Sequence, residues 1–562
     1  MPSDLDATLW ENVEGLYKAL LDRELKDSGC LEQLLLDRSE LDAAVYEARV
    51  NLSIRMRCHT DDKHAKSSFL AFIEHVMPRF EQAGFELDRK IVGSPHAANL
   101  DGARYEVLLR NLRADIEIFR EENIALQIEE KKLDQQFQQT SGAMTVAIWG
   151  EERTLPEMVR FMEEAERATR EAAWRGIWER RELDRERLDD VLDKLVALRS
   201  EIARNAGIDN YRDYMFKRLH RFDYTPADCE SFHDAVEAVC VPLLRSLNAE
   251  RASSLGVDPL RPWDLTADVK SRPPLRPFAN CSELIDKSSR LFHRMDLSLG
   301  KMFDSLRSGD GFDLESRKWK APGGFHANRE RSRRSFIFMN AVGTHRDLDT
   351  MLHESGHAFH AMLCHGEPLL HYKRPPKEFT EVASMSMELF AFPYLDEFYD
   401  EMALARAKRQ RLELVATILP WIAVLDAFQH WLYANPDHNR SERDAYWIQL
   451  NDRFGPAVSW EGLERYRQMS WQIVGHLYGA PFYMIEYGIA QLGALQFWLQ
   501  FKQDRPRAME NYRRGLALGG SRPLPELFQA AELTFEFGHD MMKRLMDEVQ
   551  KELDKIRDLR IV

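Results

Sequence analysis

The sequence of 562 residues has only six cysteines, and none of them forms a Cys-x-x-Cys pair. They are scattered along the chain, at Cys30, Cys58, Cys229, Cys240, Cys281 and Cys364. Scattered cysteines are typical of free thiols in a reducing compartment, whereas a disulfide framework or a cysteine-rich zinc site needs regular, close spacing. We therefore expect a cytoplasmic protein whose thiols are reduced.

The sequence also lacks the segments that would direct a chain to a membrane or to nucleic acid. Its first residues, 1–11, are acidic and show neither the basic start nor the apolar stretch of a signal peptide. No uninterrupted run of 18 apolar residues occurs, so we expect no membrane span. Lys plus Arg total 77 against 92 Asp plus Glu, and the net charge of −15 argues against a nucleic-acid partner.

Most of the chain has the spacing of amphipathic helices. In 9–17 and 105–113, for example, apolar residues recur every three or four positions with charged residues between them. The segments 142–150 and 335–340 are instead short, apolar and β-branched or aromatic, which predicts strands. The densely charged segment 151–204 predicts two long helices that face solvent.

The most informative stretch is 351–359, which contains His353, Glu354 and His357 in the pattern His-Glu-x-x-His. On a helix, residues four apart lie on one face, so both imidazoles can reach a single ion. Glu354 lies about 100° around the helix axis from His353, beside the water that such an ion would bind. The alternative is an ordinary amphipathic helix with two satisfied histidines, and a third ligand decides between the two.

A third ligand is expected on the next helix. The metzincin pattern would need histidine where Leu363 stands, so that class is excluded. The following apolar helix carries Glu378, Glu381 and Glu388, and buried carboxylates are unfavourable unless they are paired or bind a cation. Glu381 and Glu388 share a face. Glu378, one turn earlier, is a rival ligand, and the residues alone leave both choices open.

The motif His-Glu-x-x-His, followed after 23 residues by Glu381 within Phe-Thr-Glu-Val-Ala-Ser-Met-Ser-Met-Glu, resembles the thimet oligopeptidase and oligoendopeptidase F family of zinc metallopeptidases. The resemblance implies one Zn²⁺ per chain, held by His353, His357 and Glu381. It also implies that Glu388 orients a ligand imidazole through its other ring nitrogen.

A second motif lies in 475–491. Glycines on both sides of His476 predict a flexible loop, and Tyr483 and Tyr487, four apart, share a face of the next helix. Such donors can stabilise an oxyanion, although a tyrosine pair on an apolar helix is also typical of core packing. The resemblance implies that His476 and Tyr483, with Tyr487 next, contact the scissile carbonyl, and it leaves open which of them stabilises the oxyanion.

The segment ahead of the zinc helix is the expected substrate-binding element. A turn containing Gly324 precedes the strand 335–340, and we expect this strand to lie at the sheet edge and to bind extended peptide by backbone pairing. Gly324, Phe338 and Asn340 are the expected contacts, with a plain core strand as the alternative. Phe338-Met-Asn340 lacks the Gly-x-Met-Glu-Asn pattern of zinc aminopeptidases, so no capture of a free N-terminus is expected.

The resemblance extends from about residue 154 to 535 and implies an elongated, mainly helical fold with a deep central channel and a small sheet beside the zinc helix. We expect an N-terminal helical domain, 1–195, and a catalytic domain, 196–562. The expected activity is that of a zinc-dependent oligoendopeptidase acting on short peptides, with Glu354 as the proton acceptor. A peptidyl-dipeptidase is an alternative within the enzymes. A degenerate peptide-binding scaffold is an alternative outside them, against which the intact Glu354 argues. The sequence does not indicate the oligomeric state.

Overall fold

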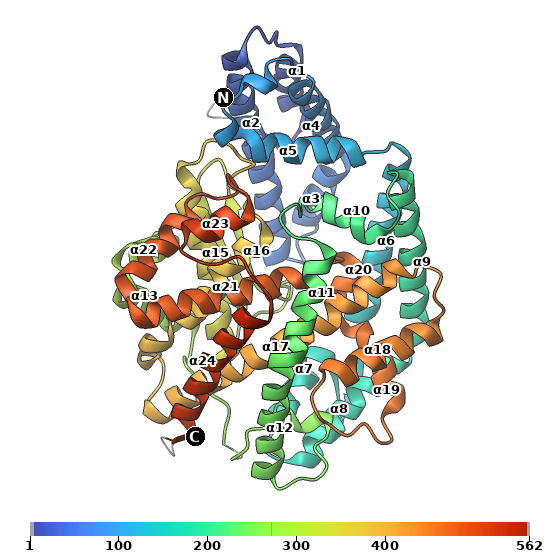
Figure 1. Ribbon diagram of the computed structural model, residues 1–562, viewed down its shortest axis with the longest axis vertical. Helices are drawn as coiled ribbons and strands as arrows, with labels where there is room; N and C mark the ends of the chain where they lie inside the picture. Colours follow the sequence, from blue (N-terminus) through green and yellow to red (C-terminus); the bar gives the residue numbers. More distant parts are fainter. Residues whose placement is uncertain (1–4, 271, 559–562) are drawn as a thin grey trace. The chain divides into compact units, whose positions relative to one another are not determined.

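The computed structural model describes residues 5–270 and 272–558 and consists mainly of helices (Figure 1). The chain forms two compact units, each built from three separated segments. The first unit comprises Met1–Ile116, Leu275–Leu404 and Ala490–Phe535. The second comprises Glu117–Pro274, Ala405–Ile489 and Glu536–Val562. The predicted mainly helical fold with a small sheet is confirmed. The division after residue 195, the elongated shape and the channel stay predictions.

The first unit contains the following elements: α1 (Trp10–Asp22), α2 (Ser28–Cys58), α3 (Lys63–His75), α4 (Met77–Val92), α5 (Gly102–Ile118), α13 (Cys281–Met295), α14 (Leu297–Arg307), β3 (Phe312–Glu315), β4 (Phe325–Arg329), β5 (Arg334–Ala341), α15 (His345–Leu363), α16 (Lys377–Phe390), α21 (Met484–Gln503), α22 (Arg505–Leu516) and α23 (Leu524–Ala530). A unit boundary falls within α5, within α21 and within α17 (Glu401–Ala434).

The second unit contains these elements: α6 (Glu122–Gly142), β1 (Thr145–Ile148), β2 (Glu151–Thr154), α7 (Leu155–Arg160), α8 (Arg167–Glu182), α9 (Arg185–Asn205), α10 (Tyr211–Arg218), α11 (Pro226–Ala235), α12 (Val241–Leu255), α17 (Glu401–Ala434), α18 (Arg440–Phe454), α19 (Glu464–Gln468), α20 (Gly475–Gly479) and α24 (His539–Asp558). Short 3₁₀ or π turns complete the two units: η1 (Ala97–Asn99), η2 (Phe161–Glu163), η3 (Val236–Cys240), η4 (Pro262–Asp264), η5 (Cys364–Gly366), η6 (Phe392–Glu397) and η7 (Ser470–Ile473).

The sheet of the first unit has the strand order β3-β5-β4, with β3 parallel and β4 antiparallel to β5. The strand β5 is therefore central, and its apolar run 336–339 is buried, as expected for a strand covered on both faces. The prediction that 335–340 forms a strand is confirmed, but the prediction that it lies at the edge is wrong. The terminal strands are β3 and β4, and β4 pairs with β5 in the register Phe325 to Phe338.

The helix α15 begins at His345, directly after a capping threonine. Thr344 is its N-cap, and the side chains of Thr344 and Asp347 form a reciprocal capping box. The helix packs against β4, β5 and α16. At Gly356, a Cβ atom would lie 2.5 Å from Ser384 Cα and 2.7 Å from the Ala383 carbonyl oxygen. The missing side chain at Gly356 therefore lets the backbone of α16 approach α15 closely.

The helix α17 is long and apolar enough to cross a membrane by length and composition, which the sequence analysis did not expect. The reason for the difference is that isolated polar residues such as Asp426 interrupt the apolar run without lowering its mean hydropathy much. Of the residues in its most apolar window, 72% are buried inside the structure. Burial of this kind is also found in core helices.

Candidate metal centre and catalytic residues

Two histidines of α15 and one glutamate of α16 face one another in the first unit. The Nε2 atom of His353 lies 3.5 Å from Glu381 Oε2, and the Nε2 atom of His357 lies 3.7 Å from the same oxygen. Zinc bonds of about 2.0–2.2 Å in tetrahedral geometry place neighbouring ligand atoms about 3.3–3.6 Å apart. The three donor atoms, all within 4.8 Å of one another, therefore fit a single ion of this kind.

Glu388, two turns along α16 from Glu381 and on the same face, contacts the first histidine through its other ring nitrogen. The Nδ1 atom of His353 lies 2.6 Å from Glu388 Oε1, so a proton on Nδ1 is donated to this carboxylate. The lone pair of Nε2 is then directed toward Glu381, which is the tautomer that metal binding requires. The structure thus places Glu388 where the sequence analysis expects it.

Burial keeps the second histidine uncharged. It lowers the pKa of the His357 imidazole to about 4, in spite of the opposing effect of the Glu381 carboxylate. Neutral imidazole is the form that binds a metal ion. His357 therefore does not need to lose a proton before it can bind an ion at neutral pH.

Glu354 is a buried carboxyl beside this group, with 7% of its surface exposed. Burial, helped by the negative charge of Glu381, raises the pKa of Glu354 to about 7, although His353 and the backbone N–H of His326 act in the opposite direction. An acid with a pKa near neutrality can both accept and return a proton at physiological pH. The backbone contact also places Glu354 next to β4, the strand that contains His326.

Three residues that were not predicted from the sequence position α16 or its Glu381 side chain. Gly356 permits the close approach described above, the Ser384 hydroxyl donates to Glu381 Oε2 at 3.2 Å, and the Tyr512 hydroxyl donates to the Ala383 carbonyl at 3.0 Å. A glycine inside a helical pattern often marks a close backbone approach, so Gly356 could have been found from the sequence. Tyr512 could not, because it is distant along the chain.

Two of the expected substrate contacts have other partners. The Phe338 side chain is fully buried and stacks on Phe325, with ring centroids 4.8 Å apart. The Asn340 amide donates to the carbonyls of Ala321 and Gly323 at 2.8 and 2.9 Å. Because β5 is central, Phe338 and Asn340 do not offer a free strand edge, and that part of the expectation is corrected. They shape the turn that contains Gly324 and leads into β4.

The residues His476, Tyr483 and Tyr487 come together in the second unit. Their ring centroids are separated by 5.7 Å (His476 to Tyr483), 6.2 Å (His476 to Tyr487) and 5.1 Å (Tyr483 to Tyr487). Burial lowers the pKa of His476, which favours its neutral form. The predicted flexible loop around His476 is instead a short helix, α20. A shared active site for this cluster and the metal centre stays a prediction.

A buried arginine fixes the segment that carries this cluster. Arg199 has no exposed surface, and its guanidinium donates to the carbonyls of Leu477 and Tyr478 and to the Tyr433 hydroxyl. Glu130 accepts a further bond from its Nε at 2.7 Å. The expectation that the charged segment 151–204 faces solvent is therefore wrong at Arg199, because Glu130 balances its charge and carbonyls from distant parts of the chain accept its hydrogen bonds.

The chain matches the models of a known protein family. Residues 160–547 match the model of peptidase family M3, and residues 6–119 match the peptidase M3 N-terminal domain. An oligoendopeptidase F homolog of Borreliella burgdorferi (strain ATCC 35210 / DSM 4680 / CIP 102532 / B31) is 26% identical over 192 residues. That match spans 32% of this chain and 31% of the relative's length.

Solved structures match over almost the whole chain. The structure of PZ peptidase A with an inhibitor superposes with a TM-score of 0.90 at 26% identity and covers 97% of each chain. A Bacillus anthracis str. Ames protein designated oligoendopeptidase F gives a TM-score of 0.87 at 26% identity, covering 99% of this chain and 98% of that one. With a family match over more than half of its length and a metal-ligand group of the expected spacing, the chain belongs to peptidase family M3, a family of metallopeptidases.

Proposed function

We propose that this protein is a zinc-dependent oligoendopeptidase that hydrolyses internal bonds of short, unfolded peptides. The observation that carries the proposal is the convergence of His353 and His357 on one oxygen of Glu381, at 3.5 and 3.7 Å. The names of the relatives, PZ peptidase A and oligoendopeptidase F, support the same activity. The site would bind one Zn²⁺ in each chain.

The protein's own residues supply the proton transfers. A zinc ion bound by His353, His357 and Glu381 would lower the pKa of a water molecule and polarise the substrate carbonyl. Glu354 accepts a proton from that water molecule while the water oxygen attacks the carbonyl carbon of the substrate. Glu354 then returns the proton to the leaving nitrogen. A pKa of about 7 suits both steps.

We propose that His476, Tyr483 and Tyr487 stabilise the developing negative charge on the carbonyl oxygen. Tyr483 and Tyr487 can donate from their hydroxyls and His476 from its ring nitrogen. The Tyr483 hydroxyl is the preferred donor because a tyrosine stays protonated over the whole neutral range. The buried bonds from Arg199 to the neighbouring carbonyls support this role, since such donors have to be held rigidly.

The peptide-binding edge is assigned to β4. This strand lies at the end of the sheet, and the backbone of His326 within it contacts the Glu354 carboxylate. Extended peptide added to β4 would be recognised through its backbone, with little demand on its sequence. Gly324, directly before β4, keeps its place as a candidate substrate contact, whereas Phe338 and Asn340 act by supporting the strand.

The test is a map of cleavage products. A pool of synthetic peptides is incubated with the purified full-length chain, with chelator, and with chelator followed by Zn²⁺, and the products are identified by mass spectrometry. Internal cleavage that chelator abolishes and Zn²⁺ restores supports the proposal. Release of C-terminal dipeptides alone would indicate a peptidyl-dipeptidase. A complete absence of cleavage would favour the degenerate peptide-binding scaffold.

A further inference from the structure

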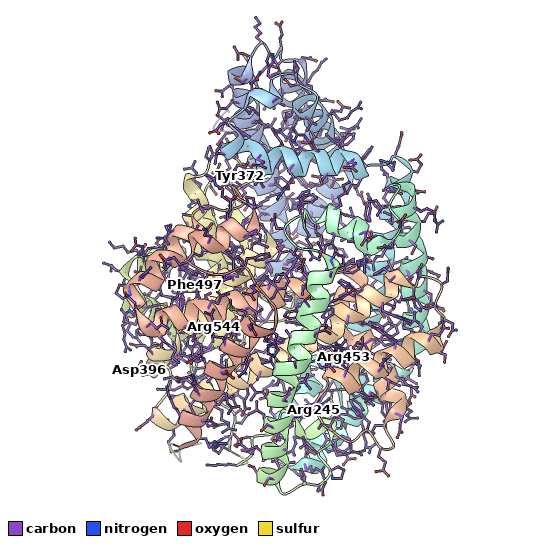
Figure 2. The ribbon with its side chains drawn as sticks, in the orientation of Figure 1. Arg245, Tyr372, Asp396, Arg453, Phe497 and Arg544 are labelled. Carbon is purple, nitrogen blue, oxygen red and sulfur yellow. The ribbon has the colours of Figure 1, made fainter. Side chains whose placement is uncertain are left out.

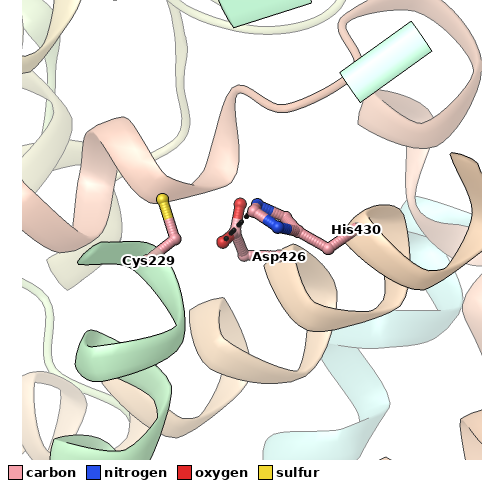
Figure 3. Close-up of side chains that lie close together, drawn as sticks. All are labelled: Cys229, Asp426 and His430. Atoms are coloured by element: carbon pink, nitrogen blue, oxygen red, sulfur yellow. Dashed lines mark ion pairs between the residues drawn. The ribbon is translucent and has the colours of Figure 1, made fainter. Parts of the chain in front are cut away.

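A second group of metal-ligating side chains lies in the second unit, on α11 and α17 (Figure 3). Cys229 and His233 are four residues apart on α11, and Asp426 and His430 are four residues apart on α17. Residues at this spacing share a helix face. Each helix therefore presents a pair of potential ligands to the other.

The distances within the group suit one ion. The donor atoms of Cys229, Asp426 and His430 all lie within 4.8 Å of one another. The Nε2 atom of His430 lies 3.3 Å from Asp426 Oδ2, close to the separation of about 3.3 Å expected for two ligands of a tetrahedral zinc ion. His233 Nε2 bonds to the same Oδ2 at 2.9 Å.

Several polar atoms of this group are buried without a hydrogen bond. Cys229 and Asp426 have no exposed surface, and His430 has 7%. Among the described residues, neither ring nitrogen of His430 nor Asp426 Oδ1 has a hydrogen-bond partner. The contact between His430 and Asp426 is thus close enough for attraction but lacks hydrogen-bond geometry. Buried polar atoms left in this state are unfavourable unless another ligand satisfies them.

We propose that Cys229, Asp426 and His430 bind a divalent transition-metal ion of the Zn²⁺ class, and that His233 orients the Asp426 carboxylate. Sulfur and imidazole donors favour such an ion over Mg²⁺ or Ca²⁺, which prefer oxygen alone. Binding replaces the S–H bond of Cys229 by a metal–sulfur bond and releases the proton to solvent. The site shares no residue with the His353, His357 and Glu381 group and does not depend on it.

A cavity adjoins the group at its two histidines. It has a volume of about 380 Å³, and His233 and His430 both form part of its wall. The acidic Glu230 and Asp234 also line it, together with Arg212 and Arg453. Arg453, labelled in Figure 2, is neutralised by Asp234 and Glu237. A cation that enters this cavity would meet two imidazoles of its wall, among charges that are largely balanced.

An ion at this position would stiffen the segment that carries Tyr483. His430 packs against the Phe482 ring, with centroids 5.6 Å apart. The neighbouring Gln429 accepts a hydrogen bond from the Phe482 backbone N–H at 2.6 Å. Phe482 has a φ of 65°, a conformation that non-glycine residues rarely adopt and that needs support from its surroundings.

Cobalt(II) titration of the metal-free, full-length chain tests the proposal, because a thiolate ligand gives Co²⁺ an intense near-ultraviolet charge-transfer band. The group on α15 and α16 offers only nitrogen and oxygen, so the band reports the Cys229 site. We expect two Co²⁺ per chain and a thiolate band for the wild type. Cys229→Ser should lose the band and one ion, and His430→Gln should weaken binding of the same ion.

Two further variants serve as controls. Cys240→Ser removes another fully buried thiol, near the end of the same helical segment, and should keep both ions and the band. His353→Ala should lose one ion and keep the band. If instead it keeps both ions, the proposed catalytic site fails while the Cys229 site stands. A wild-type chain that shows no thiolate band with saturating Co²⁺ overturns the proposal, whether or not any variant folds. A band that persists in folded Cys229→Ser overturns it as well.

Discussion

At the scale of single residues, the proposed reaction depends on where Glu354 lies. Its carboxyl is buried beside the Glu381 carboxylate, and both the burial and the like charge raise its pKa. The same surroundings that make it a poor acid in the resting protein make it a good proton acceptor near pH 7. Glutamine has nearly the same shape as glutamate but cannot accept a proton, so a glutamine at this position isolates the role of Glu354 as a base.

Glu354→Gln should therefore keep its bound zinc and lower kcat by about two to four orders of magnitude, because the amide cannot accept a proton. The measurement is kcat on a fluorogenic peptide together with zinc content by elemental analysis. Turnover at the wild-type rate in the zinc-loaded variant would remove Glu354 from its proposed role.

The rate of peptide hydrolysis should also depend on pH in a definite direction. Glu354 acts only when ionised, so kcat/KM should rise with pH through the pKa of this group and level off above it. The metal-free pKa is about 7, and a bound cation favours the carboxylate, so the midpoint should lie at or below 7. A kcat/KM profile that is flat or rises on acidification would contradict this assignment.

Much of this chemistry could be predicted from local spacing. His353, Glu354 and His357 are four residues or fewer apart, and a helix alone brings them to one side. The roles of Phe338, Asn340 and Arg199 could not be predicted in this way. Their surroundings are set by β3, by the turn 321–323 and by carbonyls nearly 280 residues away, as for Arg199 and Leu477.

At the scale of elements, the metal centre depends on the contact between α15 and α16. His353 and His357 belong to one helix and Glu381 to the other, so the spacing of the ligands follows the spacing of the helices. The contact is closest at Gly356, where any side chain would meet the α16 backbone. The distance between α15 and α16 at Gly356 therefore controls the geometry of the three ligands.

Gly356→Ala should separate the helices and weaken zinc binding. The added methyl group would lie 2.5 Å from a backbone atom, and overpacking of this kind costs about 1–3 kcal/mol of the free energy of unfolding. Gly15→Ala in α1, where a Cβ meets nothing within 4 Å, is the matched control and should stabilise slightly. Denaturant unfolding and a zinc-binding titration measure both effects. Equal zinc affinity in Gly356→Ala and the wild type would show that the close contact between the two helices does not determine the geometry of the metal ligands.

The elements themselves were largely predictable, but their partners were not. The Thr225-Pro226 start of α11, the capped start of α15 and the strand β5 all follow from local residue patterns. The order β3-β5-β4 does not, because an apolar run such as 336–339 fits a central strand and a covered edge strand equally well. The short helix α20 was missed because its two glycines favour a loop on local grounds.

At the scale of the whole molecule, neutral histidines that are buried, as His360 is, or half-buried, as His326 is, tie the stability of the fold to pH. Burial lowers the pKa of His326 and of His360 to about 3 each, whereas the value in an unfolded chain is about 6.5. Below about pH 6.5 the unfolded chain therefore binds more protons than the folded one, and stability falls as pH falls. Above this pH the contribution is fully present.

We expect the melting temperature of the metal-free protein to fall steadily between pH 7 and pH 4. His360→Gln removes one such group and should make this dependence shallower, with a lower starting stability because a buried side chain has changed. Chelator at every pH separates this effect from loss of zinc. A melting temperature that stays constant or rises on acidification would contradict the neutral, buried state of these histidines.

The central claim is that the carboxylate of Glu381, and not that of Glu378, joins His353 and His357 in binding the ion. Both glutamates are buried on α16, with 5% and 4% of their surfaces exposed, so Glu378→Gln is a matched control for Glu381→Gln. The deciding measurement is the zinc content of the two purified, folded variants beside the wild type. We expect Glu381→Gln to lose one zinc ion per chain and Glu378→Gln to keep it. Full zinc in Glu381→Gln, or the loss of that ion in Glu378→Gln alone, would contradict the claim.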